Sequence, residues 1–219
     1  FLSFILTYLP GILSYTLSFE ILLSCTPFVG RTIAFLSFPI LSVIIYILIC
    51  LCFYLVLPKL NPGKYKLGIN KGMFAWCCHL ALNRSSKVLG LRYLINSFFI
   101  FKYLHLISLG AKVSFVLRTS MDYIFVDLPL LKIGTNCSFG QNVYISCHLI
   151  KDNHLHLIPV SIGDNVDVGM NCNIGPGSRI GSNCKIEYGN NIYGSRIKDN
   201  TKIKGHEWLH GPPSAGHSN

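Results

Sequence analysis

The sequence has 219 residues, 51% of them hydrophobic, with a net charge of +10 and a mean hydropathy of +0.46. This hydropathy excludes an ordinary soluble domain and indicates that membrane segments accompany a folded part. The sequence begins with Phe1 rather than Met, so we expect it to be a fragment of a longer chain.

The positive charge belongs to the first half of the sequence. Before Asp122 the only acidic residue is Glu20, against eleven basic residues, whereas eight acids face eight bases from Asp122 onward. The basic residues flank apolar runs instead of forming a continuous stripe, so the sequence does not favour a nucleic-acid partner. A basic, apolar half next to a neutral half rich in Gly and Asn predicts a membrane portion joined to a soluble portion.

Two long uncharged runs open the chain, at Phe1–Phe19 and Thr32–Leu57. Roughly 20 apolar residues span a bilayer, so the pair predicts a transmembrane hairpin. Four lysines follow the second run: Lys59, Lys64, Lys66 and Lys71. Such an excess marks the cytoplasmic side. We therefore expect residues 1–71 to be a transmembrane hairpin with a basic cytoplasmic loop, in the inner (cytoplasmic) membrane of the cell, with the rest of the chain on the cytoplasmic side.

The next segment, residues 72–112, mixes aromatic residues with basic ones. This composition is typical of helices that lie in the membrane interface, so we predict a membrane-interfacial helical segment. A third, imperfect span within Tyr93–Leu109 is the alternative.

A strict period of six dominates the second half. Aliphatic residues stand at positions 162, 168, 174, 180, 186 and 192, and Gly follows four of them. The position four residues later is small or modest in size throughout: Val166, Cys172, Ser178, Cys184 and Asn190. Neither a helix nor a simple strand has this period, which is the signature of a hexapeptide β-helix. Gly and Asn are expected at its turns, where the backbone often needs φ > 0.

The period also sets the limits of this domain. Regular hexads begin at Ile133, break after His148 and restart at Ile162, so residues 149–160 are an excursion. We predict a parallel β-helix of about four to five coils over residues 113–205, because single coils cannot bury their own apolar face. The tail, residues 206–219, has no periodicity, and we expect it to be flexible.

The nine cysteines form no C-x-x-C pair. Cys137, Cys172 and Cys184 occupy the small inward position of a hexad, where Cys packs as a small hydrophobe. Free thiols at this density fit a reducing compartment, and no metal site is predicted from them.

The repeated coil resembles the hexapeptide-repeat transferase superfamily, whose members are trimeric left-handed β-helix proteins. A narrower similarity covers residues 89–215 and includes Asn96-Ser97-Phe98-Phe99, Leu109-Gly110-Ala111 and His148-Leu149-Ile150-Lys151. With Pro62-Gly63-Lys64-Tyr65 ahead of the coils, it resembles the membrane-embedded C-terminal region of non-ribosomal-peptide-synthetase-like (poly-lysine-synthetase-like) proteins. The resemblance implies transmembrane or interfacial α-helices followed by a left-handed parallel β-helix, assembled as a homotrimer. It also implies adenylation and carrier domains before this fragment.

The function that the resemblance implies is acyl or aminoacyl transfer to a hydroxyl or amine. The donor would be an acyl-CoA or a carrier-protein thioester, with no cofactor bound covalently. The superfamily uses a His as general base, and the residue that matches is His148. An imidazole is suited to this step because it titrates near neutral pH.

Further residues near the excursion are candidates for a substrate or cofactor loop: His154, His156, Asn142 and Met170. The sequence leaves open that His148 merely caps a coil corner and that His154 and His156 are solvated loop residues. A zinc site like that of the γ-class carbonic anhydrases is not favoured, because Met170 stands where those proteins carry a ligand His.

A second function comes from a different class. The β-helix would then be a non-catalytic module that trimerises or docks the machinery of a membrane-bound non-ribosomal-peptide-synthetase-like protein. A coil of this kind suits both functions, because the fold does not decide the function.

Overall fold

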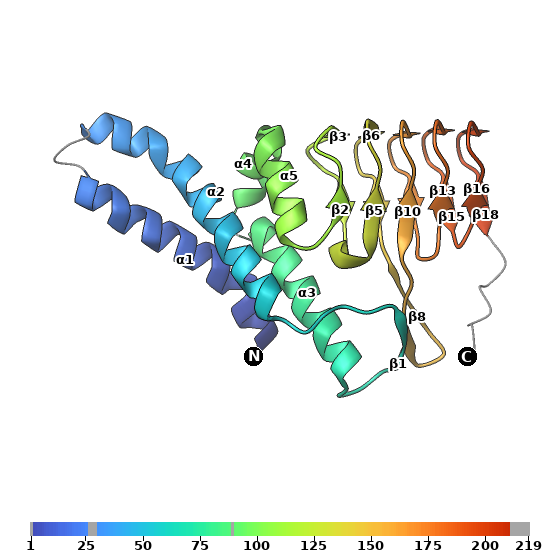
Figure 1. Ribbon diagram of the computed structural model, residues 1–219, viewed down its shortest axis with the longest axis horizontal. Helices are drawn as coiled ribbons and strands as arrows, with labels where there is room; N and C mark the ends of the chain where they lie inside the picture. Colours follow the sequence, from blue (N-terminus) through green and yellow to red (C-terminus); the bar gives the residue numbers. More distant parts are fainter. Residues whose placement is uncertain (1, 26–29, 89, 211–219) are drawn as a thin grey trace. The chain divides into compact units, whose positions relative to one another are not determined.

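The computed structural model describes residues 2–25, 30–88 and 90–210 (Figure 1). It divides into two compact units. The first is helical and comprises residues 1–58 and 77–109, and the second contains the strands and comprises residues 59–76 and 110–219.

The helical unit is built on two long helices, α1 (Leu2–Cys25) and α2 (Arg31–Val56), which pack against each other. Two short helices, α4 (Leu91–Ser97) and α5 (Phe99–Ser108), pack against α2. The imperfect third span is wrong as a continuous helix, because the backbone turns extended at Phe98 (φ −120°, ψ 121°). Neither α4 nor α5 reaches the roughly 20 residues that a bilayer crossing needs.

The apolar runs of α1 and α2 are long enough to cross a membrane, at 21 residues (Ile5–Cys25) and 22 residues (Phe35–Val56). Only 28% of each run is buried within the structure, so these are not core helices covered by the described chain. Large side chains such as Phe19, Phe35 and Leu55 are 56%, 79% and 72% exposed. Among the described residues, α1 and α2 are the two helices whose length and composition suit a membrane span.

The second unit is a parallel β-solenoid with three five-stranded sheets and five coils (Figure 1). The first sheet holds β2 (Lys112–Val113), β5 (Leu131–Ile133), β10 (Val160–Ile162), β13 (Arg179–Ile180) and β16 (Arg196–Ile197). The second holds β3 (Leu117–Thr119), β6 (Cys137–Phe139), β11 (Asp167–Val168), β14 (Lys185–Ile186) and β17 (Lys202–Ile203). The third holds β4 (Ile124–Phe125), β7 (Tyr144–Ile145), β12 (Asn173–Ile174), β15 (Asn191–Tyr193) and β18 (Trp208–His210).

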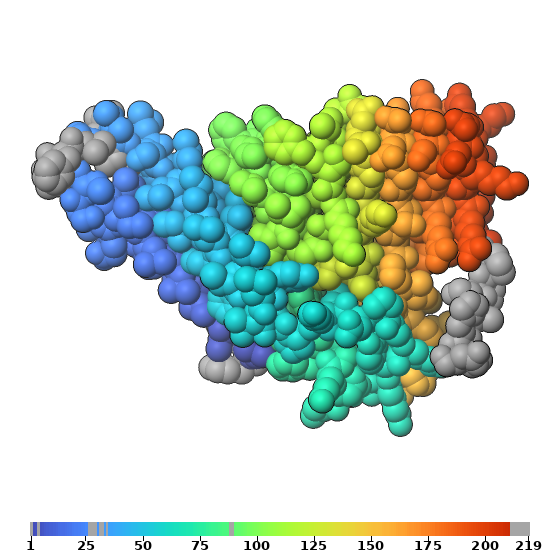
Figure 2. Space-filling view, viewed as in Figure 1, coloured from blue at the N-terminus to red at the C-terminus, as the bar shows by residue number. Residues whose placement is uncertain are grey.

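The predicted inward positions form the solenoid core. The six aliphatic residues from Ile162 to Ile192 are at most 4% exposed, and the small residues four places after them are at most 2% exposed. Equivalent residues stack across the coils, as in the pairing of Ile145 with Ile174 and of Ile174 with Ile192. The hexapeptide prediction is therefore confirmed at both inward positions, and the space-filling view shows the coils in close contact (Figure 2).

Asn and Gly meet two different requirements of the coils, positive φ and close approach of neighbouring backbones. Asn136, Asn165 and Asn183 have φ between 53° and 56°, and their side chains form a ladder in which each amide donates to the Asn one coil further on, at 2.9 to 3.2 Å. Gly177 and Gly189 occupy the same turn position with φ of 79° and 72°, so the expectation of Asn or Gly at positive φ is confirmed. Gly163 and Gly169 stand elsewhere in the hexad and do not have positive φ. A Cβ on either would come within 2.8 Å of the backbone of the next coil, so close approach is what requires Gly there.

The solenoid extends slightly beyond its regular hexads. Residues 112–125, where the sequence offers only a worn repeat, already form the first coil through β2, β3 and β4. At the far end β18 pairs in register with β15, although it lies in the segment predicted as a flexible tail. The remainder of that segment, residues 211–219, lies outside the described residues.

The excursion between the second and third coils is a β-hairpin. Its strands are β8 (His148–Lys151) and β9 (His154–Leu157), and β1 (Gly63–Lys66) pairs with the other edge of β9. All pairs in this small sheet are antiparallel, unlike those of the solenoid. α3 (Lys71–Val88) follows β1, and its first turns, up to Trp76, belong to the same unit.

Candidate functional site

His148 is the first residue of the hairpin and meets a carboxylate from the preceding coil. Phe125 in β4 pairs with Ile145 in β7, so the residues two places later, Asp127 and Cys147, occupy the same corner of consecutive coils. Asp127 has the left-handed backbone conformation (φ 56°, ψ 44°) that Asp tolerates better than most residues. This conformation ends the strand and begins the short 3₁₀ helix Leu128–Leu130.

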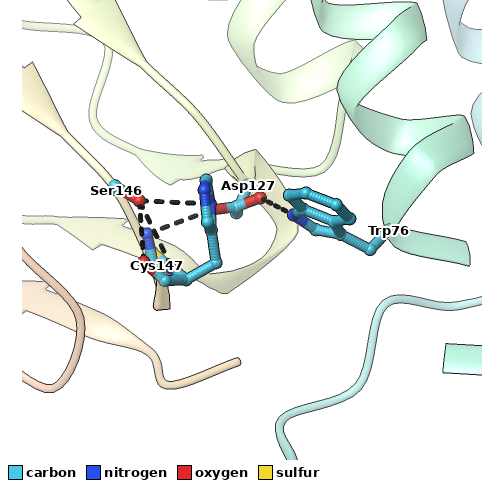
Figure 3. A network of polar contacts seen from close by, with 5 residues as sticks. Trp76, Asp127, Ser146 and Cys147 are labelled. Carbon is cyan, nitrogen blue, oxygen red and sulfur yellow. Dashed lines mark hydrogen bonds and ion pairs between the residues drawn. The ribbon is translucent and has the colours of Figure 1, made fainter. Parts of the chain in front are cut away.

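The Asp127 carboxylate is held by N–H groups on both oxygens (Figure 3). Its Oδ1 accepts a hydrogen bond from Trp76 Nε1 at 3.0 Å. Its Oδ2 accepts from the backbone N of Cys147 at 3.1 Å and lies 2.6 Å from His148 Nδ1. The Asp127 side chain is 1% exposed, whereas that of His148 is 20% exposed. A buried carboxylate with this set of donors is a fixed hydrogen-bond acceptor, since an ionised carboxylate accepts at both oxygens.

The Asp127 carboxylate determines the tautomer of His148. Because Asp127 Oδ2 accepts at Nδ1, the neutral ring carries its hydrogen on Nδ1 and keeps the lone pair on Nε2. Ser146 Oγ adds a contact to Nδ1 at 3.1 Å. No other described residue hydrogen-bonds Nε2. The orientation of the imidazole is therefore set by Asp127 through Nδ1.

Trp76 supports the pair from α3. Besides donating to Asp127, its ring lies edge-on to the His148 ring, with centroids 5.0 Å apart. An aromatic neighbour restricts the rotation of the imidazole and shields the buried ion contact from water. Trp76 therefore positions both members of the pair.

Cys147 lies beside the pair but is unsuited to act as a nucleophile. Burial raises the pKa of its thiol well above the usual range, and the nearby Asp127 charge raises it further. The thiolate is the reactive form of cysteine, so this side chain stays inert at physiological pH. The site thus contains an oriented imidazole beside an unreactive thiol.

The structure separates the other predicted site residues from His148. Asn142 and Met170 lie in turns between the second and third sheets, whereas His148 follows the third-sheet strand β7. The Asn142 side chain donates to Asn171 at 3.2 Å as part of a turn ladder, and Met170 is 52% exposed. Their role in a substrate loop stays a prediction.

His154 and His156 share one face of β9, as their alternation predicts, with ring centroids 6.4 Å apart. His148 belongs to the opposite face of the small sheet, because it pairs with Leu157. The hairpin therefore does not bring the three histidines together. Across the described residues, no three His, Cys, Asp or Glu side chains are grouped to hold a metal ion.

Two residues of the site were missed by the sequence analysis. Asp127 lies in the irregular lead-in, where no repeat marks its position, and 21 residues separate it from His148. Trp76 lies in a segment predicted as interfacial. The only sequence signal for Asp127 is a polar residue between apolar neighbours, Val126 and Leu128.

A broad groove runs along the first sheet of the solenoid. Apolar side chains such as Leu131 and Ile158 line it together with the basic side chains of Lys132, Arg179 and Arg196. His148 and Asp127 do not line this groove. The groove comes near the pair at Ile158, whose backbone N–H donates to the Cys147 carbonyl at 2.8 Å.

Comparison with known proteins agrees with the repeat. Residues 159–193 match the model of the family described as "hexapeptide repeat of succinyl-transferase". No curated protein matches the chain.

Several solved structures share the fold distantly. A hexapeptide-repeat-containing acetyltransferase from Vibrio cholerae is 14% identical over 53% of this chain and 82% of its own, with a TM-score of 0.39. A maltose O-acetyltransferase from Clostridium difficile is 19% identical over 54% and 76%, with a TM-score of 0.35. The serine acetyltransferase of Neisseria gonorrhoeae, solved with serine, is 20% identical over 90% and 81%, with a TM-score of 0.32. The repeat match and the buried hexads together identify the second unit as a hexapeptide-repeat β-solenoid.

Proposed function

We propose that this protein is a membrane-anchored acyltransferase in which His148 is the general base and Asp127 is its positioning residue. The observation that carries the proposal is the 2.6 Å contact between His148 Nδ1 and the buried Asp127 Oδ2, which leaves Nε2 free to take a proton. A hexapeptide-repeat solenoid around this pair is the setting that the superfamily resemblance implies.

In the proposed reaction, Nε2 of His148 removes the proton of a hydroxyl or amine acceptor as that group attacks the thioester carbonyl. The C–S bond breaks, the acyl group stays on the acceptor, and the thiol leaves with the proton that the imidazolium returns. Asp127 stabilises the imidazolium while it exists and keeps Nδ1 as the protonated nitrogen. The inert Cys147 is consistent with direct transfer without an acyl-enzyme.

The donor is an acyl-CoA or a carrier-protein thioester. Lys132, Arg179 and Arg196 give the groove of the first sheet the charge that suits a phosphate-bearing donor, and its apolar lining suits a pantetheine arm. Because His148 does not line the groove within one chain, we place the meeting of donor and base where two copies adjoin. This placement agrees with the homotrimer that the resemblance implies.

The anchor consists of α1 and α2, whose exposed apolar side chains require a non-aqueous surrounding. The lysines after α2 support a cytoplasmic solenoid. The relation to non-ribosomal-peptide-synthetase-like proteins, with adenylation and carrier domains upstream, stays part of the proposal and rests on the short motifs of the sequence.

The test is thiol release from acetyl-CoA and from carrier-bound donors by the chain in lipid, compared with its His148→Ala variant. We expect the variant to lose turnover by about 10²- to 10⁴-fold, the usual contribution of a general base. His206→Asn is a matched control, because His206 is an exposed turn residue with φ 61° at a position type where other coils carry Asn.

Unchanged turnover in His148→Ala would overturn the catalytic role. Absence of both turnover and thioester binding in the wild-type chain would leave the trimerising or docking module as the function. Calorimetry with acetyl-CoA and with a carrier-bound thioester measures that binding directly.

A further inference from the structure

The small antiparallel sheet has one face that the proposed chemistry does not use. Its register places Lys64, His156 and Leu149 in one row and Lys66, His154 and Lys151 in the next. Paired residues of adjacent strands point to the same side, so these six side chains share a surface. We call it the basic hairpin face.

The opposite face of the same sheet is directed inward at β9, whereas Ile150 at its β8 edge is 52% exposed. It carries His148 and the buried side chains of Leu155 and Leu157, which are 0% and 1% exposed. Burial of this side fixes which way the sheet lies on its unit. The basic hairpin face is consequently the outer side, and Lys64, Lys66 and Lys151 are all exposed there.

Among the described residues, no acidic side chain forms an ion pair with the lysines of this face. The two ion pairs among the described residues, His148–Asp127 and Lys202–Glu187, both lie elsewhere. Residues 59–71 and 148–157 together contain five lysines and a single acid, Asp152. Asp152 is at the hairpin turn, and its backbone carbonyl, not its carboxylate, contacts His154 Nδ1 at 2.7 Å. The lysines lie on the two edge strands, β1 and β8, and share one side of the sheet, so an anionic partner would stabilise this surface.

Exposed aliphatic side chains accompany the lysines. Leu149 on the face itself is 43% exposed, and Ile69 just after β1 is fully exposed. A free phosphate or a nucleic-acid backbone would attract the lysines but offer nothing to these aliphatic groups. A lipid surface takes both, since headgroups bind cations and the acyl boundary accepts apolar side chains.

The place of the face in the sequence favours the same partner. Lys64 follows the last residue of α2, Val56, by eight positions. Basic residues within about 15 to 20 residues of a membrane-spanning helix are those that face the headgroups of the cytoplasmic leaflet. β1 thus joins the juxtamembrane segment to Lys151, His154 and His156, which come from a distant part of the sequence.

We propose that the basic hairpin face docks on anionic phospholipid headgroups of the bilayer that α1 and α2 cross. The inference rests on the membrane anchoring of the proposed function. His148 begins β8, so docking of this hairpin also fixes one edge of the proposed site with respect to the lipid surface.

The experiment uses the full chain in nanodiscs of phosphatidylcholine alone and of phosphatidylcholine with phosphatidylserine. Hydrogen exchange of the amides of residues 148–157 is measured in both. We expect slower exchange in the discs with phosphatidylserine, reversed by high salt because the interaction is electrostatic. In Lys64→Gln/Lys66→Gln/Lys151→Gln the added protection should fall by about fivefold per lysine.

A control variant removes the same number of charges from the solenoid: Lys132→Gln/Arg179→Gln/Arg196→Gln. These residues lie in one outward row of the first sheet, and the variant should keep the lipid-dependent protection. An equal loss in both variants would mean that only total charge matters and would overturn the proposal.

The remaining outcomes separate this inference from its premise. A chain that enters neither kind of disc contradicts the anchoring itself. Entry into both with identical exchange contradicts docking alone. Equal protection in neutral discs after addition of inorganic phosphate or of a short DNA duplex would assign the face to a soluble anion or to nucleic acid instead of lipid.

Discussion

The regular coils and the hairpin that interrupts them treat polar side chains in opposite ways. In the coils, Asn136, Asn165, Asn183 and Asn200 each hydrogen-bond an identical residue one coil away. Where the interruption begins, His148 contacts Asp127 and Trp76, which also contact each other, and each of the three comes from a different structural element. A repeat satisfies polar groups with copies of themselves, so it builds a scaffold. A break in the repeat brings unlike groups together, and this is why we place the proposed chemistry there.

The largest expected effect on the contacts around His148 comes from a substitution of Asp127. Asn keeps the left-handed backbone that this position needs, but its amide can donate to Nδ1 and so place the ring hydrogen on Nε2. We expect Asp127→Asn to lower kcat by about 10²- to 10⁴-fold, comparable to loss of the base itself. Steady-state kinetics with unchanged thioester binding by calorimetry is the measurement. Retained kcat in a folded variant would show that His148 needs no orienting carboxylate.

The scaffold side is tested at Ile174, which is 0% exposed and stacks between Ile145 and Ile192. Ile174→Ala should lower the free energy of unfolding of the solenoid by about 2 to 5 kcal/mol, because the stacked coils cannot close the resulting cavity. Urea unfolding followed by circular dichroism measures this loss. Lys185→Ala, on the exposed side of β14, should change it by less than about 0.5 kcal/mol. Similar losses in the two variants would contradict the assignment of the core.

A substitution of Trp76 tests whether the orientation of the His148–Asp127 pair depends on the contacts made by α3. Trp76→Phe keeps an aromatic ring beside His148 but removes the hydrogen bond to Asp127 Oδ1. A hydrogen bond to a charged group contributes about 1.5 to 3 kcal/mol, and part of this is lost from the orientation of the pair, so we expect roughly a tenfold drop in kcat. KM should stay unchanged, since Trp76 acts through Asp127. A rise in KM alone would assign Trp76 to substrate binding.

The smallest effect is expected at Asp164, in a turn of the regular coils. Hydrogen bonds from the Thr135 backbone N–H and hydroxyl hold the pKa of Asp164 below its usual range. A lowered folded-state pKa stabilises the fold above the unfolded-state value of about 3.9, and this contribution disappears as the pH falls through the folded-state value. Asp164→Asn should therefore weaken the dependence of the urea midpoint on pH below about 4, and only slightly.

The matched control for Asp164 is Asp152→Asn, since the Asp152 carboxylate accepts no hydrogen bond from the described residues. This variant should leave the acid dependence of the solenoid as it is in the parent chain. An acid dependence that does not change in Asp164→Asn would mean that the Thr135 hydrogen bonds exist equally with a protonated Asp164.

The solenoid could be predicted from the sequence, because its pattern lies in residues that are close together in the chain. Each hexad from Ile162 onward has an aliphatic residue, a small residue four places later, and Asn or Gly at the turn position between them. Repetition of this pattern in five consecutive hexads restricts the register in which the strands can pair. The sequence also located the interruption at His148 and marked α1 and α2 by their length and apolarity, because these features depend only on residues that are close together in the chain.

The surroundings of His148 could not be predicted from the sequence, because they depend on contacts between distant parts of the chain. Asp127 reaches it because consecutive coils place Phe125 beside Ile145, and Trp76 reaches it because α3 follows a strand that pairs with the hairpin. The same pairing of β1 with β9 brings Lys64 and Lys66 beside His154 and His156. None of these contacts has a periodic signal, since antiparallel pairing and coil stacking join residues whose separation along the chain is set by the irregular segments between them.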